Sequence, residues 1–371
     1  MTERIRVGLL FGGASVEHEV SVVSARGVLE ALDPARFTCI PLAVTGEGRW
    51  LARERSARIL TSDARRVESA LGADDGGRLV AEPGGGIVEL HPRGGHSRVD
   101  LDVVFSVVHG WGGEDGRIQG LLDLAGVPYV GAGVLGSAVG MDKEAAKRIL
   151  ESRGIPVVPW ISLLREEYRS DPAGVVERIS TRLSFPLFVK PANGGSSVGV
   201  SRVAEPVSLP GALDQAFACD RKAVVESGID AREIECAVLG NDRPEASIPG
   251  EIVPSREFYD YAAKYLDGTS QLRIPAPLPP STVATVRRLA VEVFRALNLE
   301  GMARVDFFVE RATDRVFANE ANTLPGFTPI SMYPKLWEAS GLPYSELLDR
   351  LIRLALERAR SENTRVSRFV G

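Results

Sequence analysis

A hairpin predicted between residues 302 and 322 would bring four polar side chains to one face. A turn centred near residue 313 places Asp306 opposite Glu320. The same register places Arg304 opposite Asn322. Side chains alternate between the two faces of a strand, so these four residues share a face. Two carboxylates directly across an antiparallel pair repel each other unless something positive lies between them. The hairpin therefore predicts a site that attracts positive charge.

That positive charge has two candidate sources. Carboxylate and amide oxygens without histidine or cysteine suit a hard cation, and Mg²⁺ commonly completes its coordination shell with water and substrate phosphates. The alternative is an exposed polar face on which Arg304 pairs with the carboxylates. The hairpin alone leaves both interpretations open.

A second candidate site follows a predicted buried strand that ends at Lys190. The next nine residues read Pro-Ala-Asn-Gly-Gly-Ser-Ser-Val-Gly, and such small residues leave the backbone N–H groups accessible. A lysine beside such a loop favours binding of phosphate groups. The chain has no GxxxxGK[ST] sequence, so the loop is not a P-loop. A flexible surface loop is the competing interpretation.

Polar residues also follow two apolar runs near the N-terminus. Glu17 and His18 lie at the start of a predicted helix, just after a glycine turn, and His109 follows the second run. Ligands of parallel sheets bind at the carboxyl ends of the strands. The alternatives are an ordinary capped helix, with Ser15 as its cap, and a histidine in a plain loop.

Residues 131–136 match GxGxxG literally, and Glu151 lies at the distance expected of a ribose-binding acidic residue. However, Glu151 falls at the end of a helical segment, and no second strand supplies it to a ribose. We therefore reject a nicotinamide dinucleotide site. These glycines instead predict a tight strand-to-helix turn.

Alternation of strands and helices positions these residues. Residues 5–11 form a continuous apolar run followed by apolar residues at helical spacing, and residues 103–108 and 118–125 repeat the pattern. Such alternation predicts a parallel sheet. The stretch 62–99 has no clear period and predicts loops around one or two short strands. The other predicted elements are a helix at 142–153, strands at 185–189 and 223–226, an irregular tyrosine-rich segment at 258–275, a helix at 281–297, and a terminal helix from residue 344 to about residue 360.

Composition excludes several classes of protein. The 371 residues are 44% hydrophobic and 25% charged, which is typical of a globular protein with two to three domains. A net charge of −5 argues against nonspecific binding of nucleic acid or an anionic membrane. Three widely spaced cysteines without CxxC argue against a disulfide framework and a structural zinc site. No signal-peptide core or membrane span is visible, and we expect a cytoplasmic protein.

Lysine is scarce in this chain. Only six of the 44 basic residues are lysines, so each one calls for a reason. They are Lys143, Lys147, Lys190, Lys222, Lys264 and Lys335.

Seven segments share their residues and their order with a single family. They are residues 12–21, 109–116, 141–143, 190–199, 232–241, 258–265 and 319–333. Together they resemble the D-alanine:D-alanine ligase family of the ATP-grasp superfamily along nearly the full chain. The resemblance implies an α/β ATP-grasp fold in three parts. These are an N-terminal Rossmann-like substrate domain at 1–140, a small central α+β subdomain at 141–239, and a larger C-terminal α+β catalytic subdomain at 240–371 with a mobile loop at about 256–275.

The resemblance also implies an activity. ATP would phosphorylate the carboxylate of one D-alanine, and the amine of a second would attack this D-alanyl phosphate. The products are D-alanyl-D-alanine, ADP and phosphate, for peptidoglycan precursor synthesis. The implied cofactors are ATP and two Mg²⁺ ions, for which Mn²⁺ can substitute. The implied assembly is a homodimer, with no nucleic acid or membrane partner.

Site residues carry over by position. Those implied to bind ATP are Lys143, Lys190, Ser196, Ser197, Glu226, Glu233, Lys264 and Asn319. Those implied to hold the metal ions are Asp306, Glu320 and Asn322. Glu226 with the following backbone would hold adenine, Glu233 would bind ribose, and Lys264 would reach the γ-phosphate.

The amino-acid substrates have implied residues as well. Glu17 would bind the ammonium of the first D-alanine, with its carboxylate near His109, and Ser331 would take the carboxylate of the second. Arg304 and the backbone N–H of Gly326 would stabilise the tetrahedral oxyanion. Ser196 and Tyr265 would hydrogen-bond with Glu17 and close the mobile loop. The residues implied to be catalytic are Glu17, Ser196, Lys264, Tyr265 and Arg304.

Two rival functions remain. A nucleotide-binding regulatory protein would keep the fold and lose Arg304, Lys264 or a metal ligand, and none is lost. The second rival is a ligase of the same mechanism with another acceptor. The lysine-tyrosine signature ending at Tyr265 counts against D-lactate. D-serine is harder to exclude, because a site for D-alanine admits one additional hydroxyl group at little cost. The sequence departs from the family pattern at Ala321, which replaces a bulkier aliphatic residue, and in the stretch 62–99.

Overall fold

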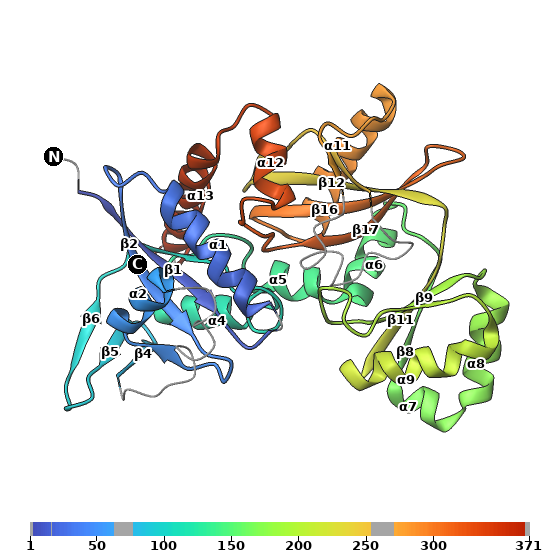
Figure 1. The fold of residues 1–371 in the computed structure, drawn as a ribbon, viewed down its shortest axis with the longest axis horizontal. Helices are drawn as coiled ribbons and strands as arrows, with labels where there is room; N and C mark the ends of the chain where they lie inside the picture. Colours follow the sequence, from blue (N-terminus) through green and yellow to red (C-terminus); the bar gives the residue numbers. More distant parts are fainter. Residues whose placement is uncertain (1–2, 16, 63–76, 254–270, 368–371) are drawn as a thin grey trace.

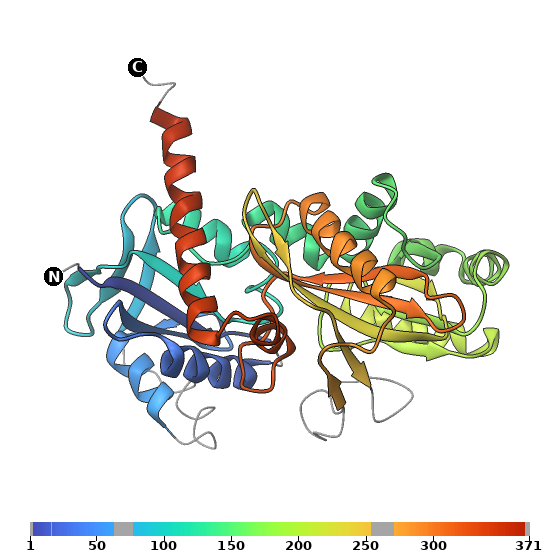
Figure 2. The ribbon, with the colours of Figure 1, turned by 90° about the horizontal axis from the view of Figure 1, so that it is seen from above.

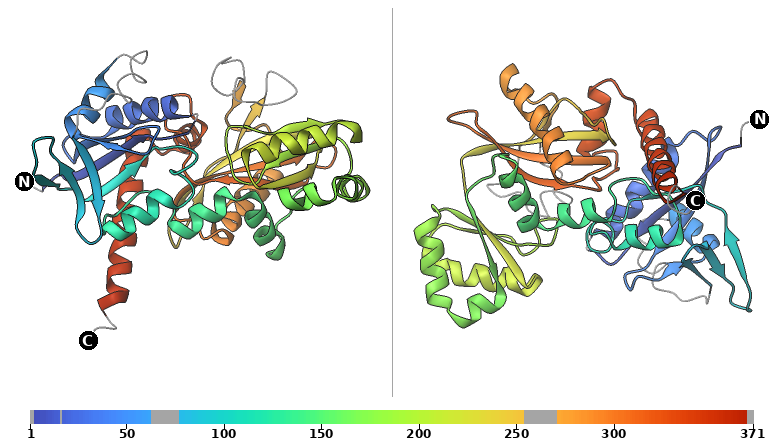
Figure 3. Two further views of the ribbon diagram at one scale, coloured as in Figure 1. Left: turned by 90° about the horizontal axis from the view of Figure 1, so that it is seen from below. Right: turned by 180° about the vertical axis from the view of Figure 1, so that it is seen from behind.

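Three β-sheets with helices packed on them make up the chain (Figure 1). The computed structural model describes residues 3–15, 17–62, 77–253 and 271–367. The N-terminal sheet and the central sheet lie at opposite ends of the molecule, as the additional views in Figure 3 also show. The third sheet lies next to both of them. The predicted site residues lie where the three parts meet.

The N-terminal sheet has seven strands in the order β6-β5-β4-β3-β2-β1-β7. Its strands are β1 (Ile5–Gly12), β2 (Phe37–Val44), β3 (Trp50–Leu51), β4 (Arg78–Glu82), β5 (Gly86–Leu90), β6 (His96–Val99) and β7 (Val103–Ser106). Its helices are α1 (His18–Ala31), α2 (Arg53–Thr61) and α4 (Arg117–Ala125). The predicted parallel pairing is confirmed for β1 with β2 and with β7, whereas β3 to β6 pair antiparallel.

The prediction for residues 62–99 was wrong in part. The described portion of this stretch contains three strands, β4 to β6, rather than one or two, and they extend the N-terminal sheet as an antiparallel meander. Leu79, Ile87 and Val99 are buried there. Tight turns rich in glycine separate the strands, so the apolar pattern is too short for a period to be visible.

The central sheet has four strands in the order β10-β9-β11-β8. They are β8 (Trp160–Leu164), β9 (Leu187–Pro191), β10 (Ser201–Val203) and β11 (Lys222–Ser227). Its helices are α7 (Arg165–Ser170), α8 (Pro172–Arg182) and α9 (Leu209–Cys219), with a 3₁₀ turn η2 (Pro206–Ser208) before α9. Asp171 caps α8 by accepting from the Gly174 N–H at 2.9 Å, and the proline at the next position favours a helix start.

Two helices connect the N-terminal sheet to the rest of the chain. They are α5 (Val134–Met141) and α6 (Lys143–Ser152). The glycines of residues 131–136 lead into α5, as predicted, and Asp142 caps α6 by accepting from the Ala145 N–H at 3.0 Å. The buried apolar face of α6, with Ala146 and Leu150, belongs to the core of the third sheet.

The third sheet contains the hairpin. Its strands are β12 (Ala231–Gly240), β13 (Glu245–Ala246), β14 (Gly250–Val253), β15 (Gln271–Arg273), β16 (Gly301–Glu310) and β17 (Val316–Asn322), and its helices are α11 (Pro280–Ala296) and α12 (Met332–Ala339). The predicted register is confirmed: Asp306 pairs with Glu320 and Arg304 with Asn322. A bulge then places Phe307 opposite Ala318 and leaves Asn319 as the extra residue.

Two further predictions meet the structure only in part. Residues 254–270, most of the predicted mobile loop, lie outside the described residues, and residues 271–273 form strand β15 instead of continuing an irregular segment. The terminal helix α13 (Tyr344–Ser367) is longer than expected and projects beyond the rest of the chain (Figure 2).

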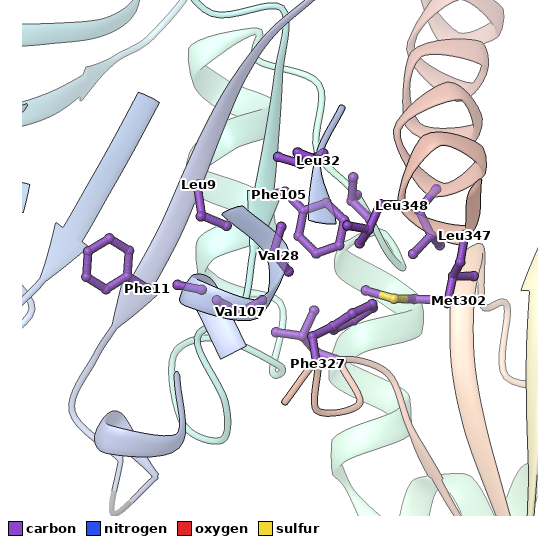
Figure 4. Packing of buried hydrophobic residues seen from close by; sticks show 14 of the residues in the cluster. Leu9, Phe11, Val28, Leu32, Phe105, Val107, Met302, Phe327, Leu347 and Leu348 are labelled. Carbon is purple, nitrogen blue, oxygen red and sulfur yellow. The ribbon is translucent and has the colours of Figure 1, made fainter. Parts of the chain in front are cut away.

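The first and third parts of the chain share one hydrophobic core. Buried residues of β1, α1 and β7 pack with Met302 of β16 and with Leu347 and Leu348 of α13 (Figure 4). Phe327 lies at the centre of this packing, with its ring 5.3 Å from that of Phe105 and 5.8 Å from that of Tyr333. The same residue immediately follows Gly326, so the core fixes a predicted site loop.

We expect Phe327→Ala to lower the free energy of unfolding by about 3–5 kcal/mol, because the lost ring leaves a cavity among residues of distant segments. Urea unfolding followed by circular dichroism measures the change. Leu124→Ala on α4 is the matched control, since Leu124 is 67% exposed and its truncation should change stability by less than about 0.5 kcal/mol. Equal effects for the two variants would contradict the shared core.

Candidate active site

One cavity of about 690 Å³ gathers the predicted site. Every residue that the resemblance places in the site and that the structure describes lines it, whereas His18, a candidate from the sequence pattern alone, does not. These residues are Glu17, His109, Lys143, Lys190, Ser196, Ser197, Glu226, Glu233, Arg304, Asp306, Asn319, Glu320, Asn322, Gly326 and Ser331. The two remaining expected residues, Lys264 and Tyr265, lie outside the described residues.

Arg304 supplies positive charge between the carboxylates of the hairpin. Its Nε and Nη2 atoms each donate to Asp306 at 2.7 Å, and Nε lies 3.0 Å from Oε2 of Glu235 on β12. Burial opposes a charged guanidinium, but Asp306 and Glu235 raise the pKa of Arg304 well above its ordinary value. The pairing with Arg304 was one of the two predicted alternatives. The prediction that this face would be exposed was wrong, because the Arg304 and Asp306 side chains are only 18% and 14% exposed.

The chemistry of the same face fits a hard metal ion. Asp306 and Glu320 are direct cross-strand partners, and all three expected ligands offer oxygen atoms to the cavity, with Asn322 two residues beyond Glu320. Within the described part of the chain, no group of three or more histidine, cysteine, aspartate and glutamate residues is arranged for a metal ion. Two carboxylates and an amide are the kind of oxygen ligands that Mg²⁺ accepts when substrate phosphates supply the others, so the expected residues fit such an ion.

Lys143 bridges the glycine-serine loop and the hairpin. Its Nζ donates to the carbonyl of Gly194 at 2.8 Å and lies 3.6 Å from Oε2 of Glu320. Ser196 and Ser197 in this loop have φ values of 50° and 58°, a left-handed conformation that is uncommon outside glycine. Successive backbone N–H groups in such a conformation can point to one side of the chain, which is the arrangement that binds anions.

Glu226 on β11 is a buried carboxylate shared by two lysines. Lys190 Nζ donates to Oε2 at 2.7 Å, and Lys147 Nζ lies 3.0 Å from Oε1. Burial alone would raise the pKa of Glu226, but the two ammonium groups lower it to about 2. Burial lowers the pKa of Lys147, and Glu226 opposes that shift.

Glu17 faces the loop from the opposite wall of the cavity. The hydroxyl of Ser196 donates a hydrogen bond to Oε1 of Glu17, the contact that the resemblance implies. A tight turn after β1 makes this approach possible: Gly12 has φ +94°, and a Cβ there would lie 2.2 Å from the carbonyl oxygen of Val44. The N-cap position of α1 is Glu17 rather than Ser15, and the Oγ of Ser15 accepts from the Glu17 backbone N–H at 3.2 Å just before the helix.

His109 is buried among polar partners. Its Nδ1 lies 3.1 Å from the carbonyl oxygen of Leu324 and 3.4 Å from Oε1 of Glu114, and its Nε2 lies 3.4 Å from Oγ of Ser24. Burial opposes a charged imidazole, but Glu114 and Glu17 raise the pKa of His109 above its ordinary value. His109 thus lies in a loop, but it is buried at the cavity wall with polar partners on both ring nitrogens.

The turn after β17 places two more expected residues side by side. The backbone N–H of Thr328 donates to Oγ of Ser331 at 3.0 Å. A Cβ at Gly326 would lie 2.7 Å from the same oxygen, so a larger residue would displace Ser331. The backbone at Gly326 and the hydroxyl of Ser331 therefore line the cavity as a unit.

Comparison with known proteins connects this site to a family. A family model described as the D-ala D-ala ligase N-terminus matches residues 6–132, and one described as the D-ala D-ala ligase C-terminus matches residues 149–353. The chain belongs to the D-alanine:D-alanine ligase family. It therefore has the predicted ATP-grasp fold, which the structural neighbours share.

Individual ligases match along nearly their whole length. The D-alanine:D-alanine ligase of Caldicellulosiruptor bescii is 45% identical over 363 residues, 97% of this chain and 98% of that protein. The solved D-alanine-D-alanine ligase from Coxiella burnetii superposes with a TM-score of 0.86 at 37% identity, covering 99% and 98% of the two chains. The VanG D-Ala:D-Ser ligase from Enterococcus faecalis superposes with a TM-score of 0.82 at 33% identity, covering 95% and 100%.

Three side chains beside the ligase site, two of them buried and one partly buried, were not among the expected residues. Lys147 was noted only as one of six lysines, although it lies four residues after Lys143 and so shares its helix face. Glu114 lies inside a segment that carries the family resemblance. Glu235 alternates with Glu233 along β12, a spacing that places both on the cavity face.

Glu226→Gln should destabilise this ligase-family chain by about 3 kcal/mol near neutral pH, because it removes the partner of two buried ammonium groups. The pKa of Glu226 is lower in the folded state, so its contribution is complete above about pH 5 and is lost as the pH falls towards 2. Urea unfolding of the wild type and Glu226→Gln at pH 7 and pH 3.5 should show that the difference between their free energies of unfolding is smaller at the lower pH. A difference that is constant or grows in acid would contradict this account.

Proposed function

We propose that this chain joins two D-alanines into D-alanyl-D-alanine with cleavage of ATP to ADP and phosphate, inside the cavity described above. The observation that carries the proposal is that every described residue expected for this reaction lines that single cavity. The residues come from strands of the central and third sheets, from the start of α6, and from loops, including those that follow β1 and β7 of the N-terminal sheet. Membership of the D-alanine:D-alanine ligase family supports the same activity, and peptidoglycan precursor synthesis is the general role of that family.

The nucleotide would bind on the side of the central sheet. Lys143 and Lys190 carry the positive charge that a triphosphate needs, and the loop with Ser196 offers backbone N–H groups beside them. Glu226 on β11 and Glu233 on β12 lie where adenine and ribose would rest. This arrangement supports nucleotide binding without a P-loop sequence.

Asp306, Glu320 and Asn322 would hold Mg²⁺, which neutralises charge on the transferring phosphoryl group when it is bound. Asn319, the bulged residue of β17, adds an amide to the same wall. We propose two ions, with Mn²⁺ as a possible substitute, because the resemblance implies both. The protein's contribution is to keep these oxygens on one face and out of the apolar core.

The first D-alanine would place its ammonium on Glu17 and its carboxylate near His109. A carboxylate oxygen attacks the γ-phosphorus of ATP, the bond to the ADP oxygen breaks, and D-alanyl phosphate forms. The Glu17 carboxylate suits an ammonium, and the raised pKa of His109 favours a cationic partner for a carboxylate, although burial works against it.

The second D-alanine would attack the acyl carbon of D-alanyl phosphate with its amine. The carbonyl oxygen becomes an oxyanion, and the inorganic phosphate then leaves with the bonding electrons while the amine loses a proton. Arg304 and the backbone N–H of Gly326 lie on the wall where that oxyanion would form, and Ser331 would bind the acceptor carboxylate. Lys264 and Tyr265, outside the described residues, complete the proposal as a γ-phosphate contact and a partner of Glu17.

D-serine is the second candidate acceptor. The observation that favours it is the VanG D-Ala:D-Ser ligase, whose structure superposes along 95% of this chain. The acceptor side of the cavity contains Ser331 and Thr328, and a site with hydroxyl groups tolerates one more hydroxyl at low cost. D-lactate is disfavoured by the lysine-tyrosine signature.

Phosphate release from ATP with Mg²⁺ tests the function. We expect release with D-alanine alone and none with L-alanine, and mass spectrometry should identify D-alanyl-D-alanine as the dominant product. D-lactate and D-serine are then added in turn at two pH values to determine the acceptor. Binding of ATP without phosphate release from any D-amino acid would contradict the ligase proposal and favour a nucleotide-binding regulatory protein.

Glu320→Gln should raise the Mg²⁺ concentration needed for half-maximal turnover by about tenfold or more, because one anionic ligand becomes a neutral amide. A Mg²⁺ titration at saturating ATP measures this shift. Glu310→Gln is the matched control, since Glu310 ends the same hairpin but does not line the cavity. Identical titrations for wild type and Glu320→Gln would exclude Glu320 as a ligand.

Two further parts of the proposal concern the setting of the enzyme. No helix in the described residues is both long and apolar enough to cross a bilayer. A reaction that consumes ATP suits the cytoplasm, and we propose that location. The resemblance supports a homodimer, with no nucleic acid or membrane partner.

A further inference from the structure

Two lysines share the carboxylate of Glu226, but only one of them reaches the cavity. The Lys190 side chain is 11% exposed and lines the cavity from β9. The Lys147 side chain is 1% exposed, lies on α6 and is absent from the cavity wall. In Figure 1, α6 lies between the third sheet and the strands β9 and β11 of the central sheet.

This asymmetry matters when an anionic ligand arrives. One of the three N–H donors of Lys190 is held by Glu226 at 2.7 Å, so an incoming phosphate group competes with Glu226 for the charge of this lysine. A carboxylate as deeply buried as Glu226 is costly without a counterion, so a lone lysine would be held by it. Lys147, on the other oxygen at 3.0 Å, keeps the carboxylate compensated whichever partner Lys190 takes.

We propose that Lys147 is a positioning residue that acts as the permanent counterion of Glu226 and thereby leaves Lys190 available to the phosphate groups of the nucleotide. The inference rests on the proposed function, because it takes the cavity to be the nucleotide site. It adds a residue that does not touch the ligand.

The surrounding charges agree with this division of roles. Lys190 faces Glu320 and Glu233 across the cavity as well as Glu226, and these carboxylates raise its pKa although burial opposes the charge. The three-residue cluster of Lys147, Glu226 and Lys190 carries one net positive charge. Of the two lysines, only Lys190 lines the cavity and can present charge to a ligand.

Binding of ADP and of adenosine by the full-length enzyme, measured by isothermal titration calorimetry, tests the proposal. Lys147→Met should weaken ADP at least tenfold, because Glu226 then retains Lys190, while adenosine, which has no phosphate, changes less than threefold. Lys147→Arg keeps the charge and should bind ADP within about threefold of wild type.

The double variant Lys147→Met with Glu226→Gln separates positioning from simple stability. Once the carboxylate is gone, Lys190 needs no second lysine, so the double variant should bind ADP as well as Glu226→Gln alone, within threefold. Replacing both members of a buried pair also spares the protein an uncompensated charge. This comparison remains decisive if Lys147→Met does not fold.

The outcomes are distinguishable. If the wild type binds neither ADP nor ATP, the proposed function fails. If the wild type binds ADP but Lys147→Met binds it equally well, only the role of Lys147 fails. Equal losses for ADP and adenosine, or a double variant more than tenfold weaker than Glu226→Gln, would show a merely structural lysine and overturn the inference.

Discussion

Like charges that face each other across β16 and β17 impose the constraint on which the rest of the site depends. Asp306 and Glu320 are direct cross-strand partners at the edge of a buried sheet, and such a pair persists only if cations surround it. Arg304 contacts one carboxylate and Lys143 approaches the other. At Glu226 the positive charges are in excess instead, because two lysines contact a single carboxylate. The cavity thus contains ion pairs of both kinds, and the proposed binding of a metal triphosphate would add charges of both signs to them.

The apolar packing keeps these charges in register. Phe327 anchors the turn beside Gly326 in a core that joins the N-terminal sheet to α12 and α13, so the wall with Arg304 cannot shift independently of the wall with Glu17. A chain that binds two amino acids and a nucleotide between separate sheets needs this connection. The proposed reaction passes through an acyl phosphate, which water would hydrolyse, so the walls of the cavity have to meet accurately around it.

The sequence predicts the site better than the scaffold behind it. The Asp306–Glu320 register follows from the period of two and a short turn, whereas the bulge at Asn319 depends on how β17 packs against its neighbours. The helix spacing could place Lys147 beside Lys143, but it could not show its partner, because Glu226 lies on β11, about 80 residues further along the chain. The meander at 78–99 has strands too short to show a period. The return of α13 to the N-terminal sheet is a tertiary contact that no local pattern contains.

A crystal structure with a non-hydrolysable ATP analogue, Mg²⁺ and D-alanine tests the central claim most directly. The account predicts adenine beside Glu226, phosphates between Lys143 and Lys190, metal ions on Asp306 and Glu320, and D-alanine next to Glu17, all within the one cavity. A nucleotide bound elsewhere on the chain, or D-alanine away from Glu17, would contradict it.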